Sequence, residues 1–361
     1  MTQLHDPQLR GFASDNYAGV HPEVLAAIAE ANGGHQIAYG EDVYTARLQE
    51  VMREHFGEAA EAFPVFNGTG ANVTALTSVL PRWGAVVSTS TAHIHTDEGG
   101  APERISGLKL LPVPTPDGKL TPDLIGEEAW GWGDEHRAQP LAVSITQTTE
   151  LGTLYSVDEV RAIADYAHER GMVLHMDGAR ISNAAAALGV GFREFTTDAG
   201  VDILSFGGTK NGLLYGEAIV VLNPSVSDGL RYLRKLNMQL ASKMRFVSAQ
   251  LIALLSDGLW LRSASHANAM AARLRAGLEE EISTGSISGV NFTQETRANA
   301  VFVTLPPGVA DRLRESFRFY DWNPATGEVR WMTAFDTTEH DIDAFLAALR
   351  TELAPRTELS V

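Results

Sequence analysis

Two histidines and an aspartate alternate with other residues in the stretch HIHTDE, which covers residues 93–98. On a β-strand the side chains of His93, His95 and Asp97 would share one face, because side chains alternate along a strand. Imidazoles and carboxylates are zinc ligands, so the spacing allows a metal site. A zinc hydrolase of this type would carry H-x-H-x-D-H, whereas the last position here is Glu98. We therefore predict no metal, and we expect His95 and Asp97 to be structural, with His95 partly buried.

A glycine-rich stretch follows an apolar run in FNGTGANVTAL, residues 66–76. If a strand ends here and a helix begins at Gly68-Thr69-Gly70, free backbone N–H groups and the positive helix end form an anion site, where a phosphate can bind. A plain strand-to-helix turn explains the stretch equally well. A dinucleotide site is disfavoured, because Val73 replaces the third glycine of the G-x-G-x-x-G pattern.

Two more apolar runs end in groups that could do chemistry. VLHMDGAR ends at Asp177, whose buried charge needs a cationic or hydrogen-bonding partner, and Arg180 could form an internal ion pair with it. LSFGGTKNG carries Lys210 in a glycine-rich turn, where partial desolvation would make the amine nucleophilic. Taken alone, Lys210 could equally be a solvent-facing lysine. Together, a phosphate site, an acid and an amine are the groups that pyridoxal phosphate requires.

The elements that must position these groups alternate between short apolar runs and helical patterns. Helices are expected at residues 70–80 and 157–169, the second opened by the capping box of Ser156 and Glu159. This alternation predicts a mostly parallel sheet flanked by helices, an α/β fold that binds ligands at the carboxyl ends of its strands. The expected strands are residues 62–66, 85–90, 109–113, 141–146, 172–176, 201–206 and 218–222.

The pattern changes after residue 257, where a smaller α+β domain is expected. We predict an N-terminal segment and large cofactor-binding domain over residues 1–256, and a small domain over residues 257–361. The small domain should contain a helix at 265–282, strands at 298–305, 318–321 and 328–334, and a final helix from 338.

Composition narrows the class of protein further. The formal net charge of -17 disfavours nucleic acid and acidic membrane surfaces as partners. The chain has no cysteine, which excludes disulfides, thiolate nucleophiles and cysteine-bound metals. No signal peptide and no membrane-length apolar run are visible, so a cytoplasmic protein is expected.

The order and spacing of motifs along nearly the whole chain resemble the low-specificity L-threonine aldolases. They run from FASDNYAG through AYGED, FNGTGAN, TAHIHTDEGGAPE, HMDGAR and FGGTKNG to LASKMRF and VRWMTAFD. The resemblance implies a fold-type I pyridoxal phosphate enzyme, similar to aspartate aminotransferase. It also implies reversible cleavage of β-hydroxy-α-amino acids, threonine or allo-threonine giving glycine and acetaldehyde.

The resemblance also implies roles for single residues. Lys210 matches the Schiff-base lysine, Asp177 the partner of the pyridine nitrogen, and His93 the histidine that stacks on the cofactor ring and is our candidate base. Ser14, Arg180 and Arg330 match the groups that hold the substrate carboxylate, a role that suits a planar guanidinium. The full set expected to bind the cofactor is Gly68, Thr69, His93, Asp177, Arg180, Thr209, Lys210, Lys243 and Arg245.

Two parts of the resemblance concern residues beyond this set. Many family members carry a second histidine in an N-T-H-N stretch, but the corresponding stretch here is TQTTE, with Thr149 at the place of the histidine. No second imidazole can therefore be assigned to the substrate hydroxyl. In the family, the region of Lys243 and Arg245 comes from a neighbouring subunit, so the resemblance implies a homotetramer built from dimers with shared sites.

Other functions remain open at this stage. Another fold-type I lyase or an aminotransferase would share the cofactor residues, and a phenylserine-preferring aldolase would share the chemistry. A zinc hydrolase is a remote alternative. A cofactor-binding regulator is disfavoured because Lys210, Asp177 and the arginines are all present.

Overall fold

The computed structural model describes residues 4–353, which form two compact units. The larger unit is Val20–Arg262, and the smaller unit combines the described residues up to Gly19 with those from Ser263 onward. The predicted boundary at residues 256 and 257 lies close to this division. The N-terminal segment, however, belongs to the smaller unit rather than the larger one. Residues 1–3 and 354–361, the outer ends of the two predicted domains, lie outside the described residues.

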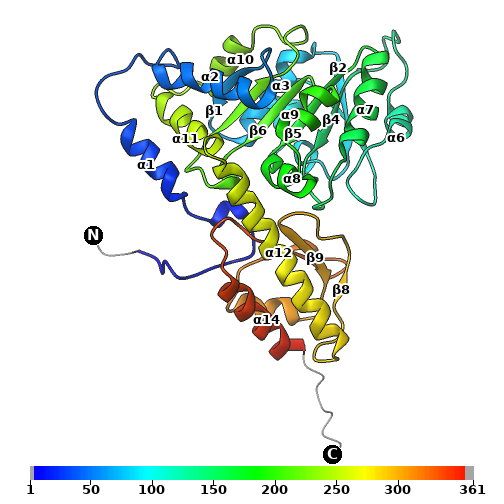
Figure 1. Cartoon of the computed structure of the whole chain (residues 1–361). Helices are drawn as coiled ribbons and strands as arrows, with labels where there is room; N and C mark the ends of the chain where they lie inside the picture. The colour runs from blue at the N-terminus through cyan, green and yellow to red at the C-terminus, as the bar shows by residue number, and fades with distance from the viewer. Residues whose placement is uncertain (1–3, 354–361) are drawn as a thin grey trace, which may run out of the picture. The chain divides into compact units, whose positions relative to one another are not determined.

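The larger unit is built on a seven-stranded sheet with the order β1-β7-β6-β5-β4-β2-β3 (Figure 1). Every neighbouring pair is parallel except the two that involve β7, which is antiparallel to both β1 and β6. The predicted mostly parallel α/β sheet is therefore confirmed. The strands are β1 (Glu61–Val65), β2 (Gly84–Thr89), β3 (Lys109–Val113), β4 (Gln139–Thr146), β5 (Val173–Gly178), β6 (Ile203–Gly207) and β7 (Glu217–Val221).

Apolar side chains leave both faces of this sheet. On β6, Leu204 packs into one core cluster and Ile203 into another, and on β2 Val87 and Val86 divide in the same way. Side chains alternate along a strand, so apolar residues at successive positions require helices on both faces. The helices that supply this cover and the connections are α1 (Pro22–Glu30), α2 (Val43–Phe56), α3 (Gly68–Val79), α4 (His93–Thr96), α5 (Ala101–Arg104), α6 (Pro122–Glu128), α7 (Val157–Glu169), α8 (Ile181–Leu188), α9 (Phe192–Phe195), η2 (Thr197–Ala199), η3 (Thr209–Asn211), α10 (Leu230–Leu236) and α11 (Arg245–Leu255).

The smaller unit contains a four-stranded antiparallel sheet with the order β10-β11-β9-β8. Trp331 and Phe345 lie edge to face in its core, with ring centroids 5.0 Å apart. Its elements are η1 (Asp15–Tyr17), β8 (Asn291–Phe292), β9 (Ala300–Thr304), α13 (Val309–Arg314), β10 (Tyr320–Asn323), β11 (Glu328–Met332) and α14 (Glu339–Leu353). Helix α12 (Leu259–Ser283) begins in the larger unit and continues into the smaller one.

The N-terminal segment joins the smaller unit through specific contacts. The ring of Phe12 stacks on Phe345 at a centroid distance of 4.5 Å, and the Phe12 N–H donates to the carbonyl of Arg318 at 2.8 Å. These contacts join residues more than three hundred positions apart, which explains why no local pattern predicted them. No helix within residues 4–353 is long and apolar enough to cross a membrane.

Candidate active site

The first turn of α3 offers free backbone donors, as the glycine-rich stretch predicted. The Oδ1 atom of Asn67 accepts from the Gly70 N–H at 2.8 Å, and the Asn67 carbonyl accepts from Ala71 at 3.0 Å. Within the described residues this leaves the N–H groups of Gly68 and Thr69 as the unused donors of the turn. A Cβ atom added at Gly68 would meet nothing within 4 Å. Free N–H groups at the start of a helix, on a turn whose first residue has no side chain, fit a phosphate.

Gly70 leaves room for a neighbouring side chain, which the sequence did not reveal. The carboxamide of Gln239 lies against its Cα, so an added Cβ would stand 2.2 Å from the Gln239 Cδ atom. The same carboxamide accepts from the Phe66 N–H at 3.0 Å and so connects the segment after α10 to the end of β1. Gln239 is therefore a neighbour of the anion site that the motif alone does not indicate.

The turn that carries Lys210 follows β6 and is held by its neighbours in the chain. The Thr209 hydroxyl accepts from the Gly216 N–H at 3.1 Å, and the Glu217 carboxylate accepts from the Gly208 N–H. Burial raises the pKa of Glu217, while the charge of Lys210 acts in the opposite direction. Lys210 itself is half-buried in η3. Glu217 was not among the predicted residues, and it braces the lysine turn from β7.

Asp177 ends β5 and is buried, as predicted from the apolar run before it. Its Oδ1 atom accepts from the Ala179 N–H at 3.0 Å. The Nδ2 group of Asn72, on α3, donates to Asp177 Oδ2 and to Glu98 Oε1, both at 2.8 Å. One amide thus holds two buried carboxylates, and it ties the phosphate-binding helix to the end of β5.

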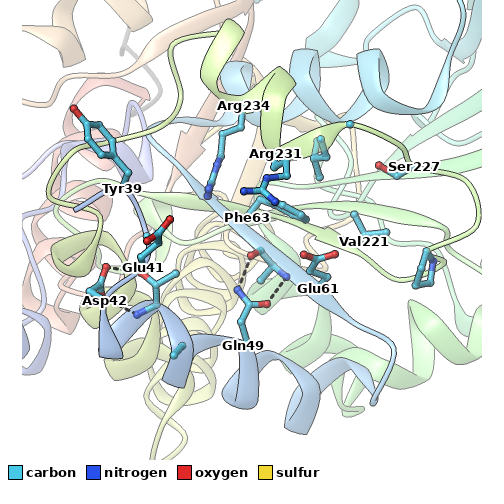
Figure 2. A pocket seen from close by; sticks show the side chains of 17 residues that line it. Tyr39, Glu41, Asp42, Gln49, Glu61, Phe63, Val221, Ser227, Arg231 and Arg234 are labelled. Carbon is cyan, nitrogen blue, oxygen red and sulfur yellow. Dashed lines mark hydrogen bonds between the residues drawn. The ribbon is translucent and has the colours of Figure 1, made fainter. Parts of the chain in front are cut away.

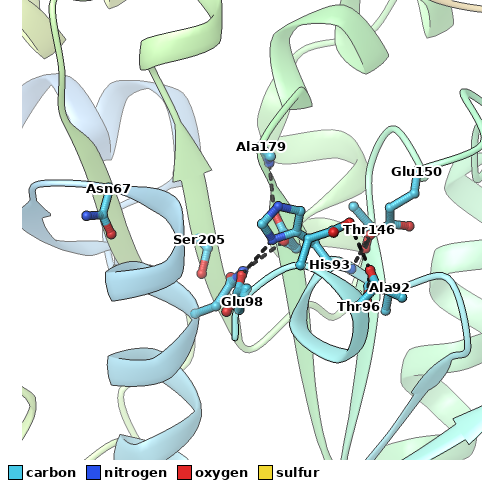
Figure 3. A network of polar contacts seen from close by, with 12 residues as sticks. Asn67, Ala92, His93, Thr96, Glu98, Thr146, Glu150, Ala179 and Ser205 are labelled. Carbon is cyan, nitrogen blue, oxygen red and sulfur yellow. Dashed lines mark hydrogen bonds and ion pairs between the residues drawn. The ribbon is translucent and has the colours of Figure 1, made fainter. Parts of the chain in front are cut away.

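Three carboxylates lie near His93, and we call Glu98, Glu150 and Asp177 the carboxylate cluster. Figure 3 shows Glu98 and Glu150 beside His93. The His93 Nδ1 atom lies 2.9 Å from Glu98 Oε1, and the His93 backbone N–H donates to Glu150 Oε1 at 2.8 Å. The charge of Asp177 acts on both His93 and Glu150. The parallel sheet explains this convergence, because β2, β4 and β5 all end at the same edge.

The cluster sets the protonation of the His93 ring. The hydrogen bond to Glu98 raises the pKa of His93, although burial and the nearby Lys210 charge oppose this effect. Because a carboxylate only accepts, Nδ1 carries the proton that points to Glu98. The Nε2 atom is then the ring position available to take or give a proton. This dependence on Lys210 and Asp177 also shows that the three predicted groups lie near one another.

Residues 93–97 do not form a strand, the arrangement in which His93, His95 and Asp97 would share one face. His93 begins the short helix α4, where side chains two positions apart do not share a face, and His95 and Asp97 are exposed. His95 is therefore not a partly buried structural residue. Within residues 4–353, no group of three or more histidine, aspartate or glutamate side chains could hold a metal ion.

The predicted substrate-binding residues lie in both units. Arg180 directly precedes α8 in the larger unit. In the smaller unit, the Ser14 hydroxyl accepts from the Asn16 N–H at 3.2 Å, and Arg330 on β11 donates to the Ala13 carbonyl at 3.4 Å. Ser14 and Arg330 are therefore neighbours within that unit. Their binding of a carboxylate stays a prediction.

Thr149 does not replace the missing imidazole. Its hydroxyl lies 2.6 Å from the Thr153 hydroxyl, in a turn that packs against Gly118. The next residue, Glu150, instead places its carboxylate beside His93. The stretch TQTTE shows a glutamate after the end of a strand. Nothing in the sequence shows whether Thr149 or Glu150 faces the site.

Lys243 and Arg245 make no described contact with the other predicted residues of their own chain. Lys243 is exposed. The Arg245 guanidinium donates to the Gly34 carbonyl at 3.2 Å, at the start of α11. Their role in binding a cofactor phosphate, which the resemblance places at the site of a neighbouring subunit, stays a prediction.

A separate cavity of about 530 Å³ lies beside the edge strand β1 (Figure 2). None of the predicted site residues lines it. The Gln49 amide pairs with the Ala62 backbone at its floor, at 2.7 and 2.9 Å. Its lining mixes the cationic Arg231 and Arg234 with the acidic Glu41, Asp42 and Glu61.

Comparison with known proteins identifies the class to which this fold and site belong. The family model described as beta-eliminating lyase matches residues 11–304, and the chain belongs to that family. Members of this family are enzymes that depend on pyridoxal phosphate, as the sequence predicted.

Among curated relatives, the chain is similar to a low specificity L-threonine aldolase of Pseudomonas sp. (strain NCIMB 10558), with 44% identity over 95% of this chain and 98% of the relative. A protein of the same name from Pseudomonas aeruginosa is 46% identical over 90% of this chain and 93% of its own length. The solved structure of a Leishmania major threonine aldolase superposes with a TM-score of 0.88 and 30% identity, covering 95% of this chain and 99% of that one. The predicted resemblance is confirmed.

The residues present fit pyridoxal phosphate. Free donors and open space lie at the start of α3, a buried carboxylate ends β5, and a half-buried lysine follows β6. Asp177 can still accept from a protonated ring nitrogen, since each of its oxygens has a second lone pair. The backbone donors match the phosphate of this cofactor, the carboxylate matches its ring nitrogen, and the lysine matches its aldehyde.

Proposed function

We propose that this protein is an aldehyde-lyase of the threonine aldolase type, which cleaves L-threonine or L-allo-threonine reversibly to glycine and acetaldehyde. The observation that carries the proposal is the position of His93. Its ring is bound to Glu98 and lies within the electrostatic reach of both Asp177 and Lys210. A proton acceptor near the lysine and the acid is what cleavage of a β-hydroxy amino acid requires in addition to the cofactor.

We assign the following roles within this proposal. Lys210 holds the cofactor covalently, Asp177 keeps its ring nitrogen protonated, and Gly68, Thr69 and Thr209 bind its phosphate. When bound, pyridoxal phosphate supplies the electron sink that stabilises negative charge at the substrate α-carbon. Ser14, Arg180 and Arg330 bind the substrate carboxylate.

The proton transfer falls to His93. Since Nδ1 donates to Glu98, the Nε2 atom removes the proton of the substrate β-hydroxyl, directly or through a water molecule. The paired carboxylate stabilises the positive charge that the ring then carries. The side chains that transfer this proton, His93 and Glu98, both belong to the larger unit.

A substrate panel tests the proposal. L-threonine, L-allo-threonine, D-threonine and L-phenylserine are incubated with wild type, Lys210→Ala and the matched control Lys109→Ala, an exposed lysine on β3. Glycine and aldehyde should be released by wild type and by the control. Lys210→Ala should lose the yellow absorbance of the bound cofactor and at least about 10³-fold of turnover. Formation of a keto acid without aldehyde would instead identify an aminotransferase, and a preference for L-phenylserine would identify the related aldolase.

We also propose a homotetramer built from dimers in which Lys243 and Arg245 contribute to the site of a neighbouring subunit. The exposure of Lys243 and the position of Arg245 support this arrangement. So do several exposed apolar residues that flank this region, which are Leu214, Tyr215, Tyr232, Leu236 and Met238. Exposed apolar surface of this kind is typical of interfaces.

Complementation between two inactive variants tests the shared site. Lys210→Ala and Arg245→Ala are each expected to be inactive. After reversible dissociation and random reassociation, about half of the dimers should be mixed, each with one intact site of two, so the mixture should regain up to about a quarter of wild-type activity. Absence of recovery in mixed dimers verified by mass spectrometry would show that each chain completes its own site.

We further propose a cytoplasmic location, which the cysteine-free composition supports because disulfides mark oxidising compartments.

A further inference from the structure

In the segment after β4, Thr149 stands at the place of the family histidine, and the next residue is Glu150. Glu150 Oε1 accepts two hydrogen bonds at 2.8 Å, from the His93 N–H and from the Thr146 hydroxyl. Its Oε2 atom is inaccessible to solvent and has no hydrogen-bond partner among the described residues. The Glu150 carboxylate thus uses one oxygen to hold the His93 backbone and the Thr146 hydroxyl, while its other oxygen is shielded from solvent.

This contact completes the start of helix α4. The residue before the helix is Ala92, which has no side chain that could cap it. The first N–H groups of a helix need acceptors from outside, and a carboxylate oxygen supplies one. Glu150 therefore caps α4 from a different strand end. Because His93 is the first residue of α4, the cap fixes the position of the imidazole as well.

The surroundings of Glu150 make its charge dependent on pH near neutrality. Burial raises the pKa of Glu150 to about 7, and the negative charge of Asp177 on β5 acts in the same direction. The hydrogen bonds from His93 on α4 and from Thr146 act against this rise. Tyr155, beyond the turn, is fully buried and has its own pKa raised, so it stays neutral beside Glu150.

We propose that Glu150 is a positioning residue of the aldolase reaction, whose ionised carboxylate anchors α4 and holds His93 in its working position, and whose protonation loosens that anchor. The inference rests on the function proposed above. It gives the site a second titratable group in place of the missing imidazole, one that acts through the His93 backbone and does not touch the substrate.

The test compares two variants that separate charge from geometry. Glu150→Gln keeps an oxygen that accepts from the His93 N–H but cannot ionise, whereas Glu150→Ala removes the acceptor. Glu169→Gln, an exposed glutamate at the end of α7, is the matched control. The holoenzymes are assayed for kcat and KM across neutral pH, and hydrogen exchange is measured by mass spectrometry in the peptide over residues 93–97. Exchange rates are corrected for their intrinsic pH dependence, with the α7 peptide as internal reference.

The proposal expects a distinct result for each variant. In wild type and Glu169→Gln, log kcat/KM should fall on the acid side with a slope of about 2, since His93 and Glu150 both titrate, and in Glu150→Gln with a slope of about 1. Exchange over residues 93–97 should quicken in wild type from about pH 8 to about pH 6, but not in Glu150→Gln. Glu150→Ala should exchange faster at both pH values and lose about 10- to 100-fold of kcat with little change in KM, the size expected for a lost charge-assisted hydrogen bond.

Equal acid slopes and equal exchange in wild type and Glu150→Gln would overturn the proposal, as would wild-type kcat in a folded Glu150→Ala. If no substrate of the panel releases aldehyde, the proposed function fails on its own. The exchange measurement still decides whether Glu150 anchors α4, because it does not depend on turnover.

Discussion

The two sides of the candidate site are built in different ways. On one side, the glycine turns at Gly68–Gly70 and Gly207–Gly212 present backbone N–H groups and Lys210 directly after β1 and β6. On the other side, the carboxylate cluster surrounds His93 with side chains from three separate segments, two of which are held by Asn72. The glycine turns need only a local chain geometry, whereas the cluster exists only once the sheet has assembled.

The two sides of the site respond differently to pH. Backbone donors are fixed in charge, so the glycine turns provide a pH-independent anion site. The cluster contains groups whose protonation depends on their neighbours, as the raised pKa of His93 and that of Glu150 demonstrate. Substitutions on the two sides should therefore separate binding and stability from proton transfer.

The largest expected effect comes from removing the imidazole at the centre of the cluster. His93→Asn should lower kcat by about 10²- to 10⁴-fold, the usual contribution of a positioned acid or base. The cofactor should stay bound with its absorbance intact, because the glycine turns and Lys210 are unchanged. Steady-state kinetics and an absorbance spectrum check both parts. Wild-type turnover in this variant would remove His93 from the role of base.

A substitution in the glycine turns should mainly affect stability. In Gly70→Ala the new methyl group would collide with Gln239, whose displacement breaks the bond to Phe66. Overpacking of this kind should lower the free energy of unfolding by about 1–3 kcal/mol, measured by urea denaturation. Gly70→Ala combined with Gln239→Ala should recover part of the loss.

The matched control for this prediction is Gly33→Ala, where a Cβ meets nothing within 4 Å. Its free energy of unfolding should stay within about 0.5 kcal/mol of wild type. Equal losses at positions 33 and 70 would show that the contact with Gln239 is not the cause.

A smaller loss is expected away from both sides. Ser156 caps α7 through the Glu159 N–H at 3.2 Å, and Glu159 in turn accepts from the Ser156 N–H at 2.7 Å. Ser156→Ala should lower the free energy of unfolding by about 1 kcal/mol without changing kcat/KM. The exposed Ser316→Ala serves as control. A change in kcat/KM in Ser156→Ala would show that a loss of stability far from the site also changes catalysis.

The smallest effect concerns the pH dependence of stability. A histidine whose pKa is raised in the folded state stabilises the fold below its unfolded pKa, and this contribution is lost as the pH rises through the folded pKa. Glu98→Gln removes the main cause of the raised value, so its free energy of unfolding should decline less than that of wild type across this range. The effect is small because the His93 side chain is 41% exposed and screened by water. Urea denaturation at several pH values measures it, and identical pH profiles would contradict it.

The sequence predicted the sheet of the larger unit because its strands are apolar on both faces and end in glycine, aspartate or lysine motifs. Strand β3 was predicted with its observed bounds, and β1 is displaced by one residue. The same local logic placed Gly68, Asp177 and Lys210 at strand ends. The two-residue strand β8 was not predicted, since two residues carry no periodicity.

The residues that the sequence missed act through long-range contacts. Asn72 and Glu98 are separated by 26 positions, and Asn72 and Asp177 by 105. Gln239 meets Phe66 across 173 positions. A glutamate beside a strand end is usually solvated, so only the packed structure distinguishes Glu98, Glu150 and Glu217 from exposed acids. The predicted strand 85–90 ends before His93, and the short helix α4 lies in the crossover connection that must follow a parallel strand.

The burial of Glu150 has a consequence for engineering. Because its pKa is raised in the folded protein, the stability contributed by its neutral form is lost progressively as the pH rises from 4.5 to about 7, and is absent above that range. Above neutral pH, the molecule thus tolerates an unfavourable charge in its interior. Selection for thermal stability alone at alkaline pH would therefore favour uncharged residues at position 150. The most stable of these variants would have the lowest kcat.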